Sequence, residues 1–97
     1  MLNSKQRAFL RSIANDLQPI FQLGKGGVNE NLVRQIGEAL EAREILKVTV
    51  LKTALVDTKS VAVEVAEAVE ADVVQVIGSK FVLYRESKES KKILLPW

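Results

Sequence analysis

The stretch from Ile20 to Leu51 limits the possible folds more than any other part of the chain. A short β-rich run over 20–23 leads into Gly24-Lys25-Gly26-Gly27, then into a stripe of apolar residues at helical spacing, then into a second β-rich run over 45–51. A helix that joins two strands of one sheet makes a right-handed crossover between parallel strands. The stretch therefore predicts a domain built on a sheet with at least one parallel step.

The rest of the chain extends this pattern. A helix capped by Asn3 or Ser4 is predicted to stop before Pro19, because the residue before a proline disfavours helical geometry. Residues 57–70 alternate like a strand at their valines but also fit a helical stripe, and we predict a helix. Strands over 73–77 and 81–85 are joined through Gly78-Ser79-Lys80 as a hairpin. The predicted order is α-β-α-β-α-β-β.

The length of 97 residues suits one small domain with a modest core. We therefore predict an α/β fold of the α+β type, a two-layer sandwich in which helices pack on a mixed four-stranded sheet. Residues 1–97 form a single domain in this prediction, and 86–97 form a partly loose tail. Gly37 lies inside the second helix, where glycine costs about 1 kcal/mol against alanine, and we interpret it as a close-packing position on the sheet.

Several classes of function are excluded by composition. The chain has no cysteine and no histidine, which excludes disulfides, thiolate or imidazole metal sites and nucleophile–histidine catalysis. No acid–base pair supports an enzyme, so we expect no catalytic residues, no metal and no cofactor. The sequence has neither the apolar run of a signal peptide nor one of membrane-spanning length. We expect a cytoplasmic protein, monomeric and without a membrane partner.

The net charge is only +2, but its distribution is uneven. Both ends of the chain are basic, and the segment 57–72 is acidic. Such asymmetry favours a polyanion bound at one face. An ordinary mixed surface charge remains the alternative.

The glycine-rich loop has the chemistry of an anion site. Glycines allow close backbone approach, the start of a helix offers free N–H groups, and Lys25 adds a full charge. The spacing fits neither a P-loop nor a dinucleotide fingerprint, but Gly24 to Gly27 match GxxG, the loop with which KH domains clamp a nucleic-acid backbone. Asn29 is a good cap for the helix that follows. A tight turn without a ligand is the alternative.

Basic side chains elsewhere supply further candidate contacts with RNA. Arg7 and Arg11 lie four residues apart beside the apolar stripe of the first helix, with Lys5 nearer its other edge. Lys80 is expected in the hairpin turn, while Lys47 and Thr49 are interpreted as the polar, open face of the sheet. The predicted RNA-binding residues are Gly24, Lys25, Gly26, Gly27, Asn29, Arg7, Arg11, Lys5 and Lys80.

Taken together, several short motifs carry a family resemblance over nearly the whole chain. They are Lys5-Gln6-Arg7 with Leu10, Ala14, Leu17 and Pro19, then Gly24 to Val28, Val76-Ile77-Gly78, Val82 to Arg85, and Ile93 to Pro96. The chain resembles the CRM domain (chloroplast RNA splicing and ribosome maturation) in its small stand-alone bacterial form, the YhbY type. Where that family commonly has Ser or Thr after the loop, this chain has Asn29.

The resemblance implies a fold similar to the C-terminal domain of translation initiation factor 3. It also implies RNA binding, with precursor large-subunit rRNA and the pre-ribosomal particle as partners, and the GxxG loop falls on Gly24 to Gly27. An alternative of another class is a small protein-interaction adaptor that uses the acidic helix and the apolar tail 94–97.

Overall fold

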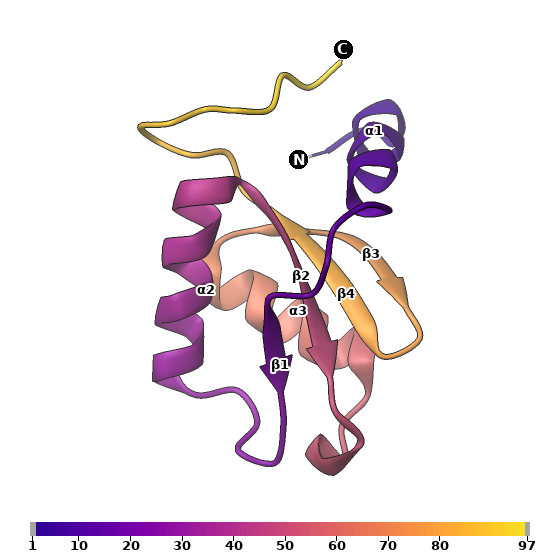
Figure 1. Ribbon diagram of the computed structural model, residues 1–97, viewed down its shortest axis with the longest axis vertical. Coiled ribbons are helices and arrows are strands. Elements are labelled where there is room, and N and C mark those ends of the chain that lie inside the picture. The colour runs from indigo at the N-terminus through magenta and orange to yellow at the C-terminus, as the bar shows by residue number, and fades with distance from the viewer. Residues whose placement is uncertain (1, 97) are drawn as a thin grey trace.

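The computed structural model describes residues 2–96 and confirms the predicted order of elements and the fold class. The helices are α1 (Ser4–Ala14), α2 (Glu30–Arg43) and α3 (Thr58–Val69), and a short 3-10 helix, η1 (Lys52–Ala54), follows the second strand. The strands are β1 (Phe21–Leu23), β2 (Ile45–Val50), β3 (Asp72–Ile77) and β4 (Lys80–Tyr84) (Figure 1). The ambiguous segment 57–70 is helical, as predicted.

Each long helix begins at a polar cap that the sequence supplies. The Asn3 side chain accepts from the Gln6 N–H, and the Gln6 side chain accepts in return from Asn3, which makes a capping box. The side chains of Asn29 and Asp57 cap α2 and α3 as acceptors, without the reciprocal bond of a capping box. The first helix ends at Ala14, earlier than predicted, and Leu17 follows in a turn bonded to the Ala14 carbonyl.

The sheet has four strands in the order β1-β2-β4-β3. Strand β1 runs parallel to β2, and β4 is antiparallel to both of its neighbours, β2 and β3. Gly78 takes a φ of +57° in the β3–β4 turn, a conformation that favours glycine. Lys80 was expected in that turn, but it is the first residue of β4 and pairs with Ile77.

Helices cover both faces of the sheet, and the two faces carry different side chains. Helices α2 and α3 pack on one face, where α3 passes behind the strands in the view of Figure 1. Helix α1 packs on the upper part of the other face, against Ile45, Val74, Val82 and Tyr84. It adds a partial third layer, which the predicted two-layer sandwich did not include. The larger core, between the sheet and α2 and α3, is centred on Leu23, Ile36, Leu40, Leu46, Val48, Val65, Phe81 and Leu83.

Gly37 lies inside α2, as predicted, but not at a close contact. A methyl group at Gly37 would meet only Val69 of α3, at 3.9 Å, which is an ordinary contact distance. The interpretation of Gly37 as a close-packing position on the sheet is therefore wrong.

Among residues 2–96, no helix has the length and apolar character needed to cross a membrane.

Candidate nucleic-acid interface

The glycine loop is a tight turn between β1 and α2. The Gly27 N–H donates to the Gly24 carbonyl at 2.9 Å, and Gly27 has a φ of +64°. Lys25 and Gly26, the two central residues of the turn, are exposed. The turn's internal bond does not use their N–H groups, so both remain available to a ligand.

The backbone favours glycine at only one place in this turn. Gly27 has a positive φ, which glycine adopts without strain. A methyl group at Gly24 would lie 3.5 Å from Leu51 Cδ1, and one at Gly26 would find its nearest neighbour, the Asn29 amide, at 3.9 Å. Since Gly26 has neither strain nor crowding, folding alone does not explain its missing side chain.

The turn leads directly into the N-terminus of α2. The Asn29 side chain accepts from the Leu32 N–H at 2.8 Å, which leaves the first N–H groups of the helix unused by this cap. The partial positive charge of a helix start favours an anion there. Glu30, in the first turn of the helix, brings an opposing negative charge and is exposed.

A second lysine lies beside the turn, and the sequence analysis missed it. Leu23 pairs in register with Val50, and the Leu51 N–H donates to the Leu23 carbonyl at 2.8 Å. The chain therefore leaves both strands at the same edge of the sheet. Lys25 stands two residues after Leu23, and Lys52, in η1, stands two residues after Val50. Only the parallel register could have indicated this pairing of Lys25 with Lys52.

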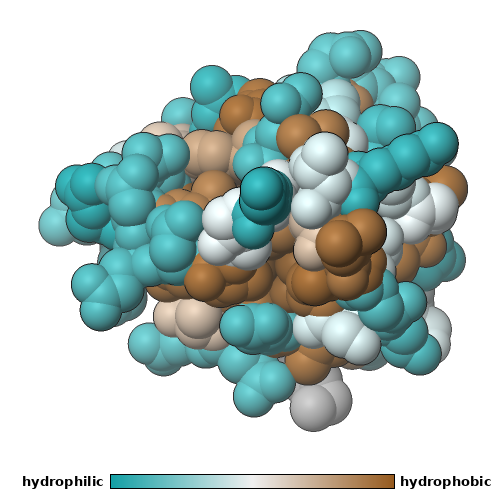
Figure 2. Space-filling view, turned by 90° about the horizontal axis from the view of Figure 1, so that it is seen from below, coloured by the Kyte–Doolittle hydropathy of each residue, from teal (hydrophilic) through white to brown (hydrophobic). Residues whose placement is uncertain are grey.

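Exposed apolar side chains lie close to Lys52 in the chain. Leu51 and Val56 are exposed, and Leu55, with a φ of +53°, has 91% of its surface accessible. Figure 2 shows the molecule from below, at the end that carries the glycine turn and η1, and apolar side chains gather at the centre of this face among hydrophilic ones. The turn thus combines positive charge, open backbone and apolar surface.

The basic residues of α1 are not brought to the glycine turn. Arg7 was predicted as a contact with RNA, but it is half-buried and its guanidinium donates to the Val73 carbonyl of β3. Val73 lies in register with Leu83 and, through it, with Leu46, at the other end of β2 from Val50. The end of β1 lies four residues along the strands and three strand spacings across the sheet from Val73. This geometry puts Arg7 about 20 Å from the turn. Lys5 is exposed and Arg11 half-buried on the same helix.

Lys80 lies elsewhere again, on the part of the sheet that α1 leaves open. It pairs with Thr49, and Lys47 of β2 pairs with Val82, so the two lysines are diagonal neighbours on one face. The interpretation of Lys47 and Thr49 as the polar face of the sheet agrees with this register. Lys80 therefore joins Lys47 rather than Lys25.

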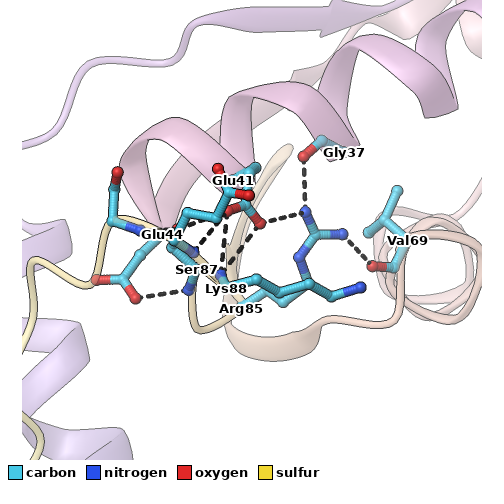
Figure 3. Close-up of polar contacts among 9 residues, drawn as sticks. Gly37, Glu41, Glu44, Val69, Arg85, Ser87 and Lys88 are labelled. Carbon is cyan, nitrogen blue, oxygen red and sulfur yellow. Dashed lines mark hydrogen bonds and ion pairs between the residues drawn. The ribbon is translucent and has the colours of Figure 1, made fainter.

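The tail after β4 is held by two carboxylates at the C-terminal end of α2, Glu41 in the helix and Glu44 directly after it. Glu44, which has no exposed surface, accepts from the Ser87 N–H at 2.7 Å, the Lys92 N–H at 2.6 Å and the Ile93 N–H at 2.8 Å. Glu41 accepts from the Ser87 hydroxyl and from the N–H groups of Lys88 and Glu89 (Figure 3). These contacts tie the tail to the C-terminal end of α2, far from the glycine turn.

Arg85 adds a second link at this end. Its guanidinium donates to the Val69 carbonyl and to the Gly37 carbonyl, both at 2.8 Å, and lies 3.8 Å from Glu41 (Figure 3). Further along the tail, Ile93 and Leu95 pack against the cluster under α1, while Leu94 remains exposed. Tail residues that the adaptor alternative needs for docking are thus partly used within the fold, and Trp97 lies outside the described residues.

Within residues 2–96, no three acidic side chains come together in a way that would hold a metal ion. The exposed carboxylates of α3, such as Glu64 and Glu67, lie on its solvent side.

Comparisons with known proteins agree on one family. A chain from Bacillus subtilis, described as a probable RNA-binding protein, is 54% identical over 99% of this chain and 100% of its own length. An RNA-binding protein from Haemophilus influenzae is 36% identical over 98% of this chain and 95% of its own length. The solution structure of a Staphylococcus aureus protein, described as a candidate RNA-binding protein, has 49% identity and a TM-score of 0.79 over 99% of this chain and 100% of that one. The CRS1 / YhbY (CRM) domain matches residues 2–85. The chain belongs to the CRS1 / YhbY (CRM) domain family.

Proposed function

We propose that this protein binds RNA without catalysing a reaction, and that the turn Gly24 to Gly27 holds the RNA backbone. Relatives described as RNA-binding proteins support RNA as the ligand. The observation that carries the role of the turn is Gly26, whose missing side chain the fold does not require. A side chain at Gly26 would add bulk to the exposed surface of the turn, where a phosphate would approach.

The charges around the turn suit a phosphate backbone. Lys25 and Lys52 lie at the same edge of the sheet, and the start of α2 adds the partial charge of its unused N–H groups. Such contacts neutralise phosphates and position the RNA, but they do not read its sequence. Binding through the turn should therefore depend on RNA backbone and shape, with Asn29 keeping the helix start in place.

We further propose that the RNA is precursor large-subunit rRNA and that the protein acts in assembly of that subunit. The resemblance of the loop and its flanks to stand-alone CRM proteins is the support for this step. Crosslinking in cells, followed by sequencing of the attached RNA, tests it. Recovery of precursor large-subunit rRNA is the expected result, and crosslinks to protein alone would favour the adaptor alternative.

The role of the turn is tested by salt series of RNA binding on designed variants. Gly26→Asp should weaken binding at least about tenfold, or ~1.4 kcal/mol, because it adds both bulk and negative charge. Gly26→Asn, of the same size but neutral, separates the two causes and should have a smaller effect. Neither variant requires a positive φ, so thermal melts should stay close to wild type.

Lys25→Ala removes one charge and should lower the log–log salt slope by about 0.7 if it contacts one phosphate of a single strand. Lys88→Ala is the matched control, because the Lys88 side chain is exposed and lies far from the turn. The Lys88 N–H donates to Glu41, and Glu41 lies about 18 Å along α2 from the turn. If folded Gly26→Asp bound RNA as tightly as wild type, the loop would be a turn and nothing more.

A further inference from the structure

The lower part of the sheet, on the face that α1 covers only at its upper end, holds a small hollow. Its volume is about 120 Å³, and it is lined by Asn15, Lys47, Gln75, Ile77, Lys80 and Val82. Helix α1 ends at Ala14, directly above it, so neither helix nor tail covers this part of the sheet. The hollow is smaller than the pockets of about 300 Å³ or more that take drug-sized ligands.

Two positively charged side chains line the hollow. Lys47 and Lys80 lie on one face as diagonal neighbours, since Lys47 pairs with Val82 and Lys80 with Thr49. In the part of the chain that the structure describes, neither lysine forms an ion pair with a carboxylate. Diagonal neighbours of a sheet lie roughly 7–8 Å apart, so the two ammonium groups can approach the same anion. The pair therefore suits an anion that is not part of this chain.

The other side chains that line the hollow suit a nucleic-acid base as a ligand better than a simple ion. The amide groups of Asn15 and Gln75 each offer a donor and an acceptor, which is what the edge of an unpaired base requires. Ile77, with 60% of its surface exposed, and Val82 offer apolar surface to the flat side of a base. Phosphate charge, base edge and base face are thus all matched within one hollow.

The hollow also continues the surface of the glycine turn. Gln22 of β1 pairs with Thr49, and Thr49 pairs with Lys80, so these three side chains form a row across the sheet. Gln22 stands two residues before Gly24. Lys80 lies two strand spacings across the sheet and two residues along the strand from Gly24. The distance between the turn and Lys80 is therefore about 12 Å. One strand of RNA can therefore reach both places.

We propose that this hollow receives an unpaired base of single-stranded RNA, with Lys47 and Lys80 holding the phosphates beside it. The inference rests on the proposed RNA binding and adds to it a site where the RNA must be single-stranded. The glycine turn positions the backbone, and Asn15 and Gln75 distinguish one base from another. Base preference thus depends on the sheet and not on the turn.

The test is a nuclear magnetic resonance titration of the full chain with a short single-stranded RNA and with a hairpin duplex as the paired probe. The single strand should shift the backbone resonances of Lys47, Gln75 and Ile77 together with those of Lys25 and Gly26. The duplex should shift only the turn. Shifts confined to the turn with both probes, or equal shifts of the sheet by the duplex, would overturn the inference. An absence of any shift would overturn the proposed function with it.

Variants separate charge from base reading. Lys47→Met with Lys80→Met keeps the aliphatic stems and should lower the salt slope for single strands by about 1.4, while the thermal melt stays the same or rises. Gln75→Leu should reduce the differences in affinity among homopolymeric RNAs without changing the salt slope. Lys59→Met, an exposed lysine of α3 on the opposite side of the sheet, is the control. An unchanged salt slope in the double variant would show that the two lysines bind no phosphate.

Discussion

Glu44 shows how one residue can determine where a whole segment lies. It follows the last residue of α2 with a φ of +69°, a conformation in which glycine is the usual choice. A side chain in this conformation costs about 1 kcal/mol or more. The cost is offset because the buried carboxylate accepts three backbone N–H groups of the tail, and bonds to a charged acceptor are stronger than neutral ones.

This anchor should be sensitive to acid. Burial raises the pKa of Glu44, but the N–H donors of Ser87, Lys92 and Ile93 outweigh it and hold the pKa below its usual value. The Ser87 hydroxyl, with the N–H groups of Lys88 and Glu89, lowers the pKa of Glu41 as well. Since both pKa values are lowered by folding, the stability they contribute is present above the unfolded value of about 4.3 and is lost as the pH falls through the folded values.

Glu44→Gln should therefore lower the free energy of unfolding at pH 7 by about 2 kcal/mol and flatten its decline below pH ~4.3. Denaturant titrations across this range measure both effects. Glu38→Gln, an exposed position on the same helix, should change stability by less than about 0.5 kcal/mol. If wild type and Glu44→Gln lost stability in parallel below pH ~4.3, the carboxylate would not be the anchor.

At the level of elements, Arg85 joins three parts of the fold at one point. It leaves the end of β4 and donates to the Val69 carbonyl at the end of α3 and to the Gly37 carbonyl in the middle of α2. The two helices therefore meet at Gly37, and a methyl group there would only reach ordinary contact with Val69.

Gly37→Ala should stabilise the protein by about 0.5–1 kcal/mol, because alanine is the better helix former and the added methyl finds room. The free energy of unfolding in denaturant measures the change. Ala42→Gly, on the exposed side of the same helix, is the reciprocal control and should destabilise. A loss of stability in Gly37→Ala would mean that the methyl group displaces the Arg85 guanidinium.

The elements themselves could be predicted from the sequence because their signals are local. The helical stripe of α2, its Asn29 cap and the Gly78 turn each depend on residues a few positions apart. The face on which α1 packs is not a local property, although apolar Ile45, Val82 and Tyr84 on the second face of the sheet are consistent with a helix there. The contacts of Glu41 and Glu44 join residues more than forty positions apart, and no periodicity reports them.

In the candidate site, too, local features could be predicted from the sequence and long-range features could not. The turn of Gly24 to Gly27 and the cap at Asn29 were predictable, since a glycine cluster before a helix start is a local pattern. Lys52 needs the register of β1 on β2, and the bond from Arg7 to the Val73 carbonyl needs the packing of α1. Register and packing are decided by the whole chain, which is why sequence spacing did not indicate the bond between Arg7 and Val73.

Across the whole molecule, the residues that the sequence predicted as contacts with RNA are spread over the long axis. The glycine turn lies at one end, and α1 lies towards the other (Figure 1). About 20 Å separates Arg7 from the turn by strand geometry. RNA that reaches α1 must therefore be longer than RNA that fills the turn alone.

Arg11→Glu should leave the affinity for an oligonucleotide of about four nucleotides unchanged. It should weaken the affinity for an oligonucleotide of about sixteen nucleotides. These two lengths span the usual range of single-strand site sizes. Arg11 makes the better test than Arg7, since Arg7 also bonds to the Val73 carbonyl and its loss would affect the fold. Fluorescence anisotropy with both lengths measures the effect. Equal weakening at both lengths would place Arg11 beside the turn, against the geometry described above.

The central place of β4 has a consequence for synthesis of the chain. Strands β2 and β3 do not touch each other, and each pairs with β4, the last strand to be made. A nascent chain that has emerged only as far as Ile77 has a parallel pair, β1 and β2, and a separate β3 with nothing to join them. Long-range pairing of this kind slows folding. The domain thus completes its sheet only when residues 80–84 have left the ribosome, and the segment that Glu41 and Glu44 capture follows immediately after.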